Sequence, residues 1–167
     1  LDRQQPATPC LVVDLDVVQA NFRKLRQALP DAAIYYAVKA NPAQEILALL
    51  ANLGACFDTA SLNEIDMVLD TGASADRISY GNTIKKATDI AAAYHRGVRL
   101  FAFDSAEELL KIANHAPGSR VFCRILTSGE GAEWPLSRKF GCEPAMAQRL
   151  LSEAKSLGLT PVGISFH

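Results

Sequence analysis

The chain has 167 residues, a formal net charge of −1 and 49% hydrophobic residues, which is typical of a globular protein of ordinary domain size. No apolar run approaches the ~18 residues that a membrane-spanning helix requires, so we expect no membrane segment. The 17 basic residues are scattered among 18 acidic ones, which argues against a nucleic acid or an anionic membrane as the main partner.

The ends of the chain do not look like the ends of a domain. It opens on Leu1, and it closes on residues 163–167, which look like a buried strand. Most domains end in frayed, polar segments, so we expect a truncated chain. No basic segment followed by an apolar stretch marks a secretory signal, and the default location is the cytoplasm.

The four cysteines show no C-x-x-C spacing, and three of them lie in apolar, strand-like runs. We therefore expect reduced core thiols, with neither a disulfide framework nor a metal site. These residues are Cys10, Cys56, Cys123 and Cys142.

Short apolar runs that favour strands alternate along the chain with Ala- and Leu-rich stretches of helical period. The expected strands are 10–13, 33–38, 55–57, 77–80, 98–103, 120–126 and 161–166. The expected helices are 15–29, 42–53, 62–71, 85–96, 105–116 and 144–157. This alternation is typical of βαβ units, and it predicts an α/β fold with a parallel sheet.

Residues that start and stop helices support these boundaries. Asn41-Pro42 predicts an N-cap followed by proline in the first turn, and Ser61 with Glu64, like Ser105 with Glu108, matches the reciprocal capping box. A glycine follows five of the helical stretches, where a left-handed conformation ends a helix without a Cβ clash. These are Gly54, Gly72, Gly97, Gly118 and Gly158.

Polar residues follow the strand runs at nearly regular intervals. They are Lys39, Asp58, Asn82, Asp104, Arg124 and His167. Because the carboxyl ends of parallel strands form the functional edge of α/β proteins, we expect Lys39, Asp58, Arg124 and His167 to converge. The last interval is longer because it contains an inserted polar loop, 127–141.

Lys39 closes the apolar segment 34–39. An amine in poorly solvated surroundings favours its neutral form, as a nucleophilic or Schiff-base lysine requires. The alternative is a lysine whose stem packs on the strand while its head reaches solvent. Position and surroundings alone leave both interpretations open.

Seven motifs in order along the chain resemble the eukaryotic-type ornithine decarboxylases, which are pyridoxal-phosphate (PLP) enzymes with an alanine-racemase-like barrel. The motifs are Tyr36-Ala37-Val38-Lys39-Ala40-Asn41, Phe57-Asp58-Thr59-Ala60-Ser61 with Glu64, Gly81-Asn82-Thr83-Ile84-Lys85, Phe103-Asp104-Ser105, Cys123-Arg124-Ile125, Ser137-Arg138-Lys139-Phe140-Gly141 and Gly163-Ile164-Ser165-Phe166-His167. The resemblance implies a (β/α)8 TIM-type barrel, of which this chain is an incomplete N-terminal portion. Residues 1–14 would be an entry segment and 15–167 part of the PLP-binding barrel, with a C-terminal β-domain beyond His167.

The resemblance also implies roles for individual residues. Lys39 would bond covalently to PLP and His167 would stack on its ring, which makes these two the expected catalytic residues. Arg124 would lie near the cofactor's phenolic oxygen, and Asp58 would share its polar surroundings. Ala37 and Glu64 would belong to the supporting network, although the capping box alone explains Glu64.

The resemblance further implies that the inserted loop is mobile beside the site, with Lys139 in a lid or at a dimer contact. The alternative is a solvated loop without a specific role. His95 and His115 lie at helix ends, where a partly positive imidazole suits the helix dipole, and we assign them no catalytic part.

The implied reaction is the decarboxylation of L-ornithine to putrescine by a homodimer with shared active sites. Substrate choice remains open on the same barrel, where lysine, arginine, diaminopimelate and carboxynorspermidine decarboxylases and alanine racemases occur. A second hypothesis, from another functional class, is a non-catalytic homologue that binds a regulatory partner, as antizyme inhibitors do.

Overall fold

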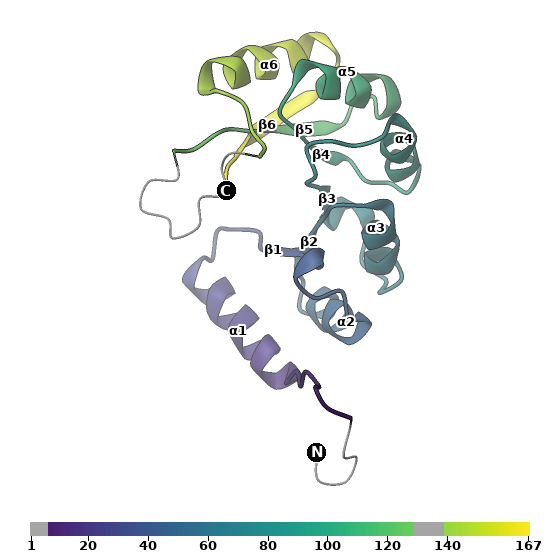
Figure 1. Ribbon diagram of the computed structural model, residues 1–167, viewed down its shortest axis with the longest axis vertical. Helices are drawn as coiled ribbons and strands as arrows, with labels where there is room; N and C mark the ends of the chain where they lie inside the picture. The colour runs from purple at the N-terminus through teal and green to yellow at the C-terminus, as the bar shows by residue number, and fades with distance from the viewer. Residues whose placement is uncertain (1–6, 129–138) are drawn as a thin grey trace. The chain divides into compact units, whose positions relative to one another are not determined.

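The computed structural model describes residues 7–128 and 139–167 (Figure 1). The chain divides into two compact units, Leu1–Ala32 and Ala33–His167. The first unit contains helix α1 (Leu15–Ala28). Its N-cap is Asp14, whose side chain accepts hydrogen bonds from the backbone N–H groups of Asp16 and Val17. The domain boundary expected after residue 14 stays a prediction.

The strand expected at residues 10–13 is wrong, because this segment is irregular. Leu11 is 83% exposed and Val12 is 62% exposed. Their side chains favour strands, but strand propensity acts only where a neighbouring strand and a packed face are present.

The second unit is built on six parallel strands whose order in the sheet is their order in the chain. Between consecutive strands the chain passes through helices that Figure 1 shows following one another along one side of the sheet. The strands are β1 (Tyr35–Ala37), β2 (Cys56–Thr59), β3 (Ile78–Tyr80), β4 (Leu100–Phe103), β5 (Arg120–Arg124) and β6 (Thr160–Ser165). The helices are α2 (Gln44–Asn52), α3 (Leu62–Leu69), α4 (Ala87–His95), α5 (Ala106–His115) and α6 (Pro144–Ser156), with short 3-10 turns η1 (Val38–Ala40) and η2 (Ala75–Arg77).

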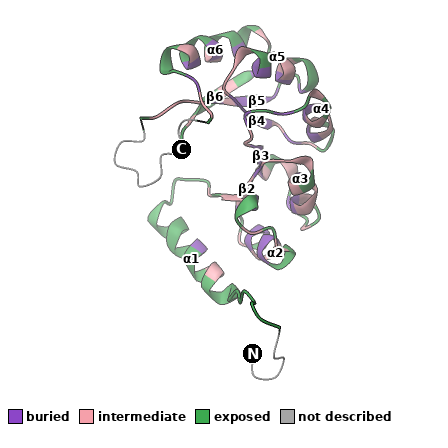
Figure 2. Cartoon of the chain, viewed as in Figure 1, coloured by how far each residue is buried: buried purple, intermediate pink, exposed green. Residues whose placement is uncertain are grey.

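The core lies between the strands and the inner sides of these helices (Figure 2). Phe57, Phe101 and Phe103 on the strands, and Ile65 and Leu109 on the helices, are fully buried. Burial of each such side chain contributes roughly 1.5–3 kcal/mol. The parallel α/β arrangement predicted from the apolar runs is therefore confirmed.

The expectation of a buried final strand is wrong. Val162 is 51% exposed and Ile164 is 55% exposed. Strand β6 hydrogen-bonds only to β5 within the described chain, which leaves its other edge uncovered.

The predicted helix ends are confirmed at all five glycines, which have φ values between 72° and 95°. The N-cap predicted at Asn41 is wrong, since α2 begins at Gln44 and the Asn41 side chain instead accepts the Ala43 N–H at 3.1 Å. Both serines accept the expected N–H, from Glu64 at 3.3 Å and Glu108 at 3.2 Å. Neither glutamate completes the box by accepting the backbone N–H of its serine. Glu64 accepts the Ala60 N–H, and the Glu108 carboxylate pairs with two lysines.

Within the described ranges no helix has the length and apolar character to cross a membrane.

Candidate functional site

The carboxyl ends of the strands border a cavity of about 340 Å³. The four residues expected to converge there, Lys39, Asp58, Arg124 and His167, all line it. They lie at or just beyond the carboxyl ends of strands β1, β2, β5 and β6, so the convergence predicted from their spacing is confirmed. The remaining lining residues are Tyr35, Ser79, Gly81, Leu100, Phe122, Ser165 and Phe166.

A smaller cavity of about 90 Å³ adjoins the first and shares Lys39, Asp58, Gly81 and Arg124 with it. One anionic and two cationic side chains therefore line both spaces, which gives the site a polar centre. The other lining residues are Ala60, Glu64, Asn82, Thr83 and Phe140.

Lys39 does not close the strand as expected. Strand β1 ends at Ala37, and Lys39 lies in the 3-10 turn η1 with an exposed side chain. Val38 takes the fully buried position beside it. The apolar run correctly predicted a strand here. Because the turn η1 follows this strand, the Lys39 side chain lies at the cavity rather than in the core.

Asp58 is held by two residues of the neighbouring strand region. Ser79 Oγ donates a hydrogen bond to Asp58 Oδ1 at 2.6 Å, and a Cβ built on Gly81 would lie 2.7 Å from Asp58 Cγ. Burial raises the pKa of the Asp58 carboxyl, against the lowering effects of the Ser79 hydrogen bond and of the charges on Lys39 and Arg124. The carboxylate is thus fixed in a partly desolvated position.

Ser79 and Gly81 are site residues that sequence reasoning missed. Strands β2 and β3 pair with Asp58 opposite Ser79, and only this register shows that the hydroxyl can reach the carboxylate. Gly81 belongs to a motif quoted above, but nothing in that motif indicates contact with Asp58. Tyr35, on β1, also lines the large cavity without having been predicted.

Arg124 and the end of the inserted loop lie together. The Arg124 guanidinium carbon is 5.4 Å from the centroid of the Phe140 ring, within reach of a cation–π interaction. Lys139 Nζ lies 5.4 Å from the same centroid, but Lys139 is exposed and lines neither cavity. Most of the loop, 129–138, is outside the described residues, so the lid or dimer role of Lys139 stays a prediction.

The supporting residues have defined places. Ala37 pairs with Asp58 across β1 and β2. Glu64 lines the small cavity, and its Oε2 accepts the Ala60 N–H at 2.6 Å. Glu64 therefore both binds the backbone before α3 and lines the site. The exposed His167 lines the large cavity, and its carbonyl accepts a hydrogen bond from the Thr127 hydroxyl at 3.2 Å.

Asp104 and Asn82 do not enter the large cavity. Asp104 Oδ2 accepts the Gly141 N–H at 2.8 Å, which ties the end of the inserted loop to β4. Asn82 lines only the small cavity, and its carbonyl accepts a hydrogen bond from Lys85. These two strand-end residues shape the surroundings of the site rather than its centre.

All four cysteines are free. The expectation of core thiols holds for Cys123 but not for Cys10, which is exposed on the irregular segment, or for Cys56, which is half-buried. Cys142 is buried although it lies outside the predicted strands, and its Sγ is 3.6 Å from Cys123 Sγ. Within residues 7–128 and 139–167, no cluster of three or more His, Cys, Asp or Glu side chains forms a metal site.

The geometry agrees with the outcome of comparisons with known proteins. The family model "Pyridoxal-dependent decarboxylase, pyridoxal binding domain" matches residues 15–167. The chain belongs to this family. The resemblance inferred from the motifs and the partial barrel fold are therefore confirmed.

The relatives of this pyridoxal-binding domain include decarboxylases and an antizyme inhibitor. The chain is 42% identical to ornithine decarboxylase from Caenorhabditis elegans, over 99% of this chain and 40% of that protein. A crystal structure of lysine decarboxylase from Selenomonas ruminantium superposes with a TM-score of 0.90 at 40% identity, over 98% of this chain and 43% of that one. Antizyme inhibitor 2 from Xenopus laevis is 41% identical over 93% of this chain and 34% of that protein. The chain thus spans about two fifths of the length of the enzymes it matches.

Proposed function

We propose that the protein is a PLP-dependent decarboxylase of basic amino acids. The observation that carries the proposal is the amine of Lys39 on the wall of a 340 Å³ cavity that Asp58, Arg124 and His167 also line. These chemical groups suit an aldehyde cofactor with a charged, aromatic ring, and the family match supports the proposal. The volume is also within the range of cofactor pockets.

The residues present fit PLP by their chemistry. The Lys39 amine would hold the cofactor through its aldehyde, as the nucleophile of the site. The His167 imidazole offers a flat face for the ring, and the Arg124 guanidinium offers charge to its phenolic oxygen. When bound, PLP draws electrons from the bond that breaks at the substrate's α-carbon.

The partly desolvated Asp58 gives the site a negative charge beside two cationic side chains. The charges on Lys39 and Arg124 lower the pKa of this carboxyl, against the raising effect of burial, and the Ser79 hydroxyl holds the carboxylate in place. An apolar surrounding for the substrate carboxylate would favour its loss as neutral carbon dioxide.

L-ornithine, with putrescine as the product, is the substrate we favour, because the Phe57-Asp58-Thr59-Ala60-Ser61 and Ser165-Phe166-His167 segments resemble the ornithine group. Lysine, or lysine and ornithine together, is the first alternative, in keeping with the structural similarity to a lysine decarboxylase. Diaminopimelate and carboxynorspermidine remain substrates of the same fold. The homodimer with shared sites and the cytoplasmic location stay predictions.

A non-catalytic binding protein is the second candidate, since one relative is an antizyme inhibitor. The presence of Lys39 and His167 at the cavity favours the enzyme, because a protein that only binds a partner needs neither an imine-forming amine nor a stacking imidazole.

Cofactor loading and product analysis test the proposal in the full-length protein. We expect a visible absorbance band of an imine-bound pyridoxal, which borohydride removes while it adds a pyridoxyl group to Lys39 in peptide mass spectra. Carbon dioxide release from ornithine, lysine and diaminopimelate then ranks the substrates. Lys39→Met is the control and should show neither the band nor turnover. A full-length protein that takes up no PLP would contradict the enzyme proposal and favour the binding protein.

A further inference from the structure

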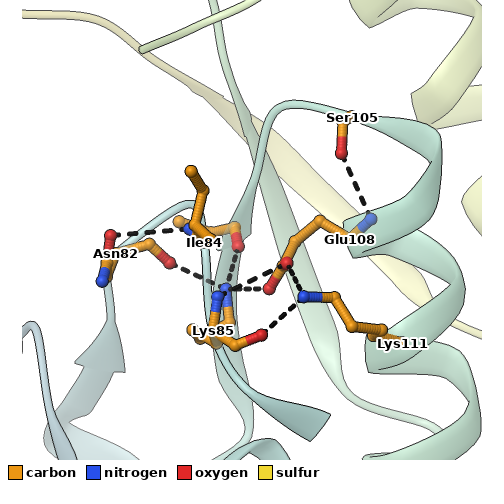
Figure 3. A network of polar contacts seen from close by, with 7 residues as sticks. Asn82, Ile84, Lys85, Ser105, Glu108 and Lys111 are labelled. Carbon is orange, nitrogen blue, oxygen red and sulfur yellow. Dashed lines mark hydrogen bonds and ion pairs between the residues drawn. The ribbon is translucent and has the colours of Figure 1, made fainter. Parts of the chain in front are cut away.

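The segment between β3 and α4 is fastened by a buried lysine that lines neither cavity. The Lys85 side chain has no exposed surface. Its ammonium donates to the carbonyls of Asn82 at 2.7 Å and Ala102 at 2.6 Å, and it lies 2.9 Å from Glu108 Oε1 (Figure 3). Two backbone carbonyls thus accept hydrogen bonds from this buried ammonium, and the Glu108 carboxylate balances its charge.

Glu108, on the first turn of α5, is the centre of the same network and is 3% exposed. Its Oε2 lies 2.5 Å from Lys111 Nζ and accepts the Lys85 N–H at 3.4 Å. Lys111 Nζ also donates to the Lys85 carbonyl at 2.5 Å. Figure 3 shows these side chains pointing toward one another from α5 and from the segment that begins at Asn82. The network joins this segment to both β4 and α5.

Stability alone does not account for such a network. Transfer of ions from water to the interior carries a large desolvation penalty, and apolar side chains of similar volume often stabilise a fold as well or better. An ionic network fixes geometry, however, because each of its hydrogen bonds has a preferred direction. The backbone atoms that Lys85 binds therefore indicate which part of the fold the network positions.

Lys85 reaches the site through two steps. The Asn82 carbonyl that it holds belongs to a residue of the small cavity, and the residue before it, Gly81, lies against the Asp58 carboxylate. The other anchor of this loop is the Gly81 N–H, which donates to the Thr59 carbonyl at 2.9 Å. A shift of the loop would move the surface on which the carboxylate rests.

We propose that Lys85 is a positioning residue, whose bond to the Asn82 carbonyl holds the loop 81–83 where it keeps the Asp58 carboxylate in the site with Lys39 and Arg124. The proposal rests on the proposed function, since cofactor binding and turnover are what the positioned carboxylate serves. Lys85 itself touches neither cofactor nor substrate.

Lys85→Met in the full-length protein is the principal test. It removes the ammonium and leaves Glu108 paired with Lys111. We expect a folded protein whose dissociation constant for PLP rises at least about tenfold and whose kcat/KM falls roughly 10- to 100-fold, as misplacement of a site group by about 1 Å can cause. A folded variant with both quantities within twofold of wild type would overturn the proposal.

Two further variants separate positioning from stability. Lys111→Met removes a member of the network that does not touch Asn82, and we expect PLP affinity within threefold of wild type even where the melting temperature falls. An equal functional loss in Lys111→Met would overturn the proposal. If Lys85→Met does not fold, Lys85→Met combined with Glu108→Leu replaces both ions by apolar groups, and the same functional loss is then expected of the folded double variant. Wild-type PLP affinity in that variant would contradict the positioning role.

Hydrogen exchange gives a readout that does not depend on the reaction. In Lys85→Met we expect the Gly81 amide to exchange at least about tenfold faster, while amides within β4 change less. Unchanged exchange at Gly81 would refute the positioning role even in an active enzyme. Faster Gly81 exchange in Lys85→Met, found together with a wild-type protein that binds no PLP, would support the positioning role while the proposed function failed. The two failures are therefore distinguishable.

Discussion

The Asp58 carboxylate lies directly on the Cα of Gly81, in the space that any side chain at position 81 would occupy. A Cβ there would overlap Asp58 Oδ1 and lie 2.8 Å from Oδ2. The backbone of Gly81 is not in the left-handed region, since its φ falls outside the range that glycine favours. Glycine is therefore required at this position for space and not for conformation.

Gly81→Ala should displace the carboxylate and impair the site. We expect a loss of roughly 10- to 100-fold in kcat/KM and a stability cost of about 1–3 kcal/mol from overpacking, measured by steady-state kinetics and urea unfolding. Gly163→Ala on β6 is the matched control, because a Cβ there meets nothing within 4 Å. Equal behaviour of the two variants would contradict the contact with Asp58.

Asp58→Asn should be more stable than wild type near neutral pH and yet impaired in function. Burial raises the pKa of Asp58 in the folded state, so the stability this carboxyl contributes is fully present below its unfolded pKa of about 3.9. That contribution is lost as the pH rises through the raised folded value, because the ionised form is poorly solvated. Asparagine does not ionise and should not show this loss.

Urea unfolding at several pH values between 4 and 7 checks this sign. The free energy of unfolding of Asp58→Asn minus that of wild type should increase with pH. Asp70→Asn, at an exposed residue after α3, controls for the loss of one negative charge. A difference that decreases with pH would mean that the folded state favours the ionised carboxylate.

Much of the fold was predictable because its signals are local. The period of apolar residues and the five glycine stops act within a few residues, and they located the helices and all six strands of the sheet. The strand predicted at residues 10–13 was wrong because strand formation there depends on a partner strand, which no local pattern reveals. The ends of parallel strands also predicted that Lys39, Asp58, Arg124 and His167 meet.

The remainder of the site depends on contacts between segments distant in sequence. The Ser79 hydroxyl reaches Asp58 because of the register between β2 and β3. Glu108 fitted a capping box in sequence, yet its carboxylate turns to Lys85, 23 residues away. Both cases are decided by which side chains face each other across elements, which a single sequence does not encode in its local pattern.

Lys85 should leave a pH signature in stability. Burial lowers the pKa of Lys85 to about 8 from 10.5, against the raising effect of Glu108. Lys111, Asp104 and the Tyr80 ring also face it. Between pH 8 and 10.5 the unfolded chain holds a proton that the folded chain has released, so the stability contribution of this group rises with pH. The total rise is at most about 3 kcal/mol.

The comparison of wild type with Lys85→Met isolates that contribution. The wild-type free energy of unfolding minus that of the variant should increase between pH 7.5 and 10, as measured by urea unfolding. A difference that does not depend on pH would show that Lys85 titrates as an ordinary solvated amine.

The cysteines should differ sharply in their reactivity toward a maleimide under native conditions. Cys10 is exposed and Cys56 half-buried, whereas Cys123 and Cys142 are buried. Burial also raises the pKa of the Cys123 thiol, which lowers the fraction of reactive thiolate. Mass spectrometry of labelled peptides should show Cys10 first and Cys123 and Cys142 only after unfolding in urea. Early labelling of Cys123 would mean that β5 opens in the native state.

The cavity spans the whole width of the sheet. Lys39 follows the first strand and His167 follows the last, yet both line one cavity, so the coiling of the sheet alone brings amine and imidazole to the same space. Adjacent strands rotate by roughly 20–25° relative to one another, and a small change in each of the five strand pairs would add up between these two residues. The distance between Lys39 and His167 therefore depends on the summed curvature of all five strand pairs. Core substitutions far from the cavity, such as at Phe101 in β4, should change the width of the cavity.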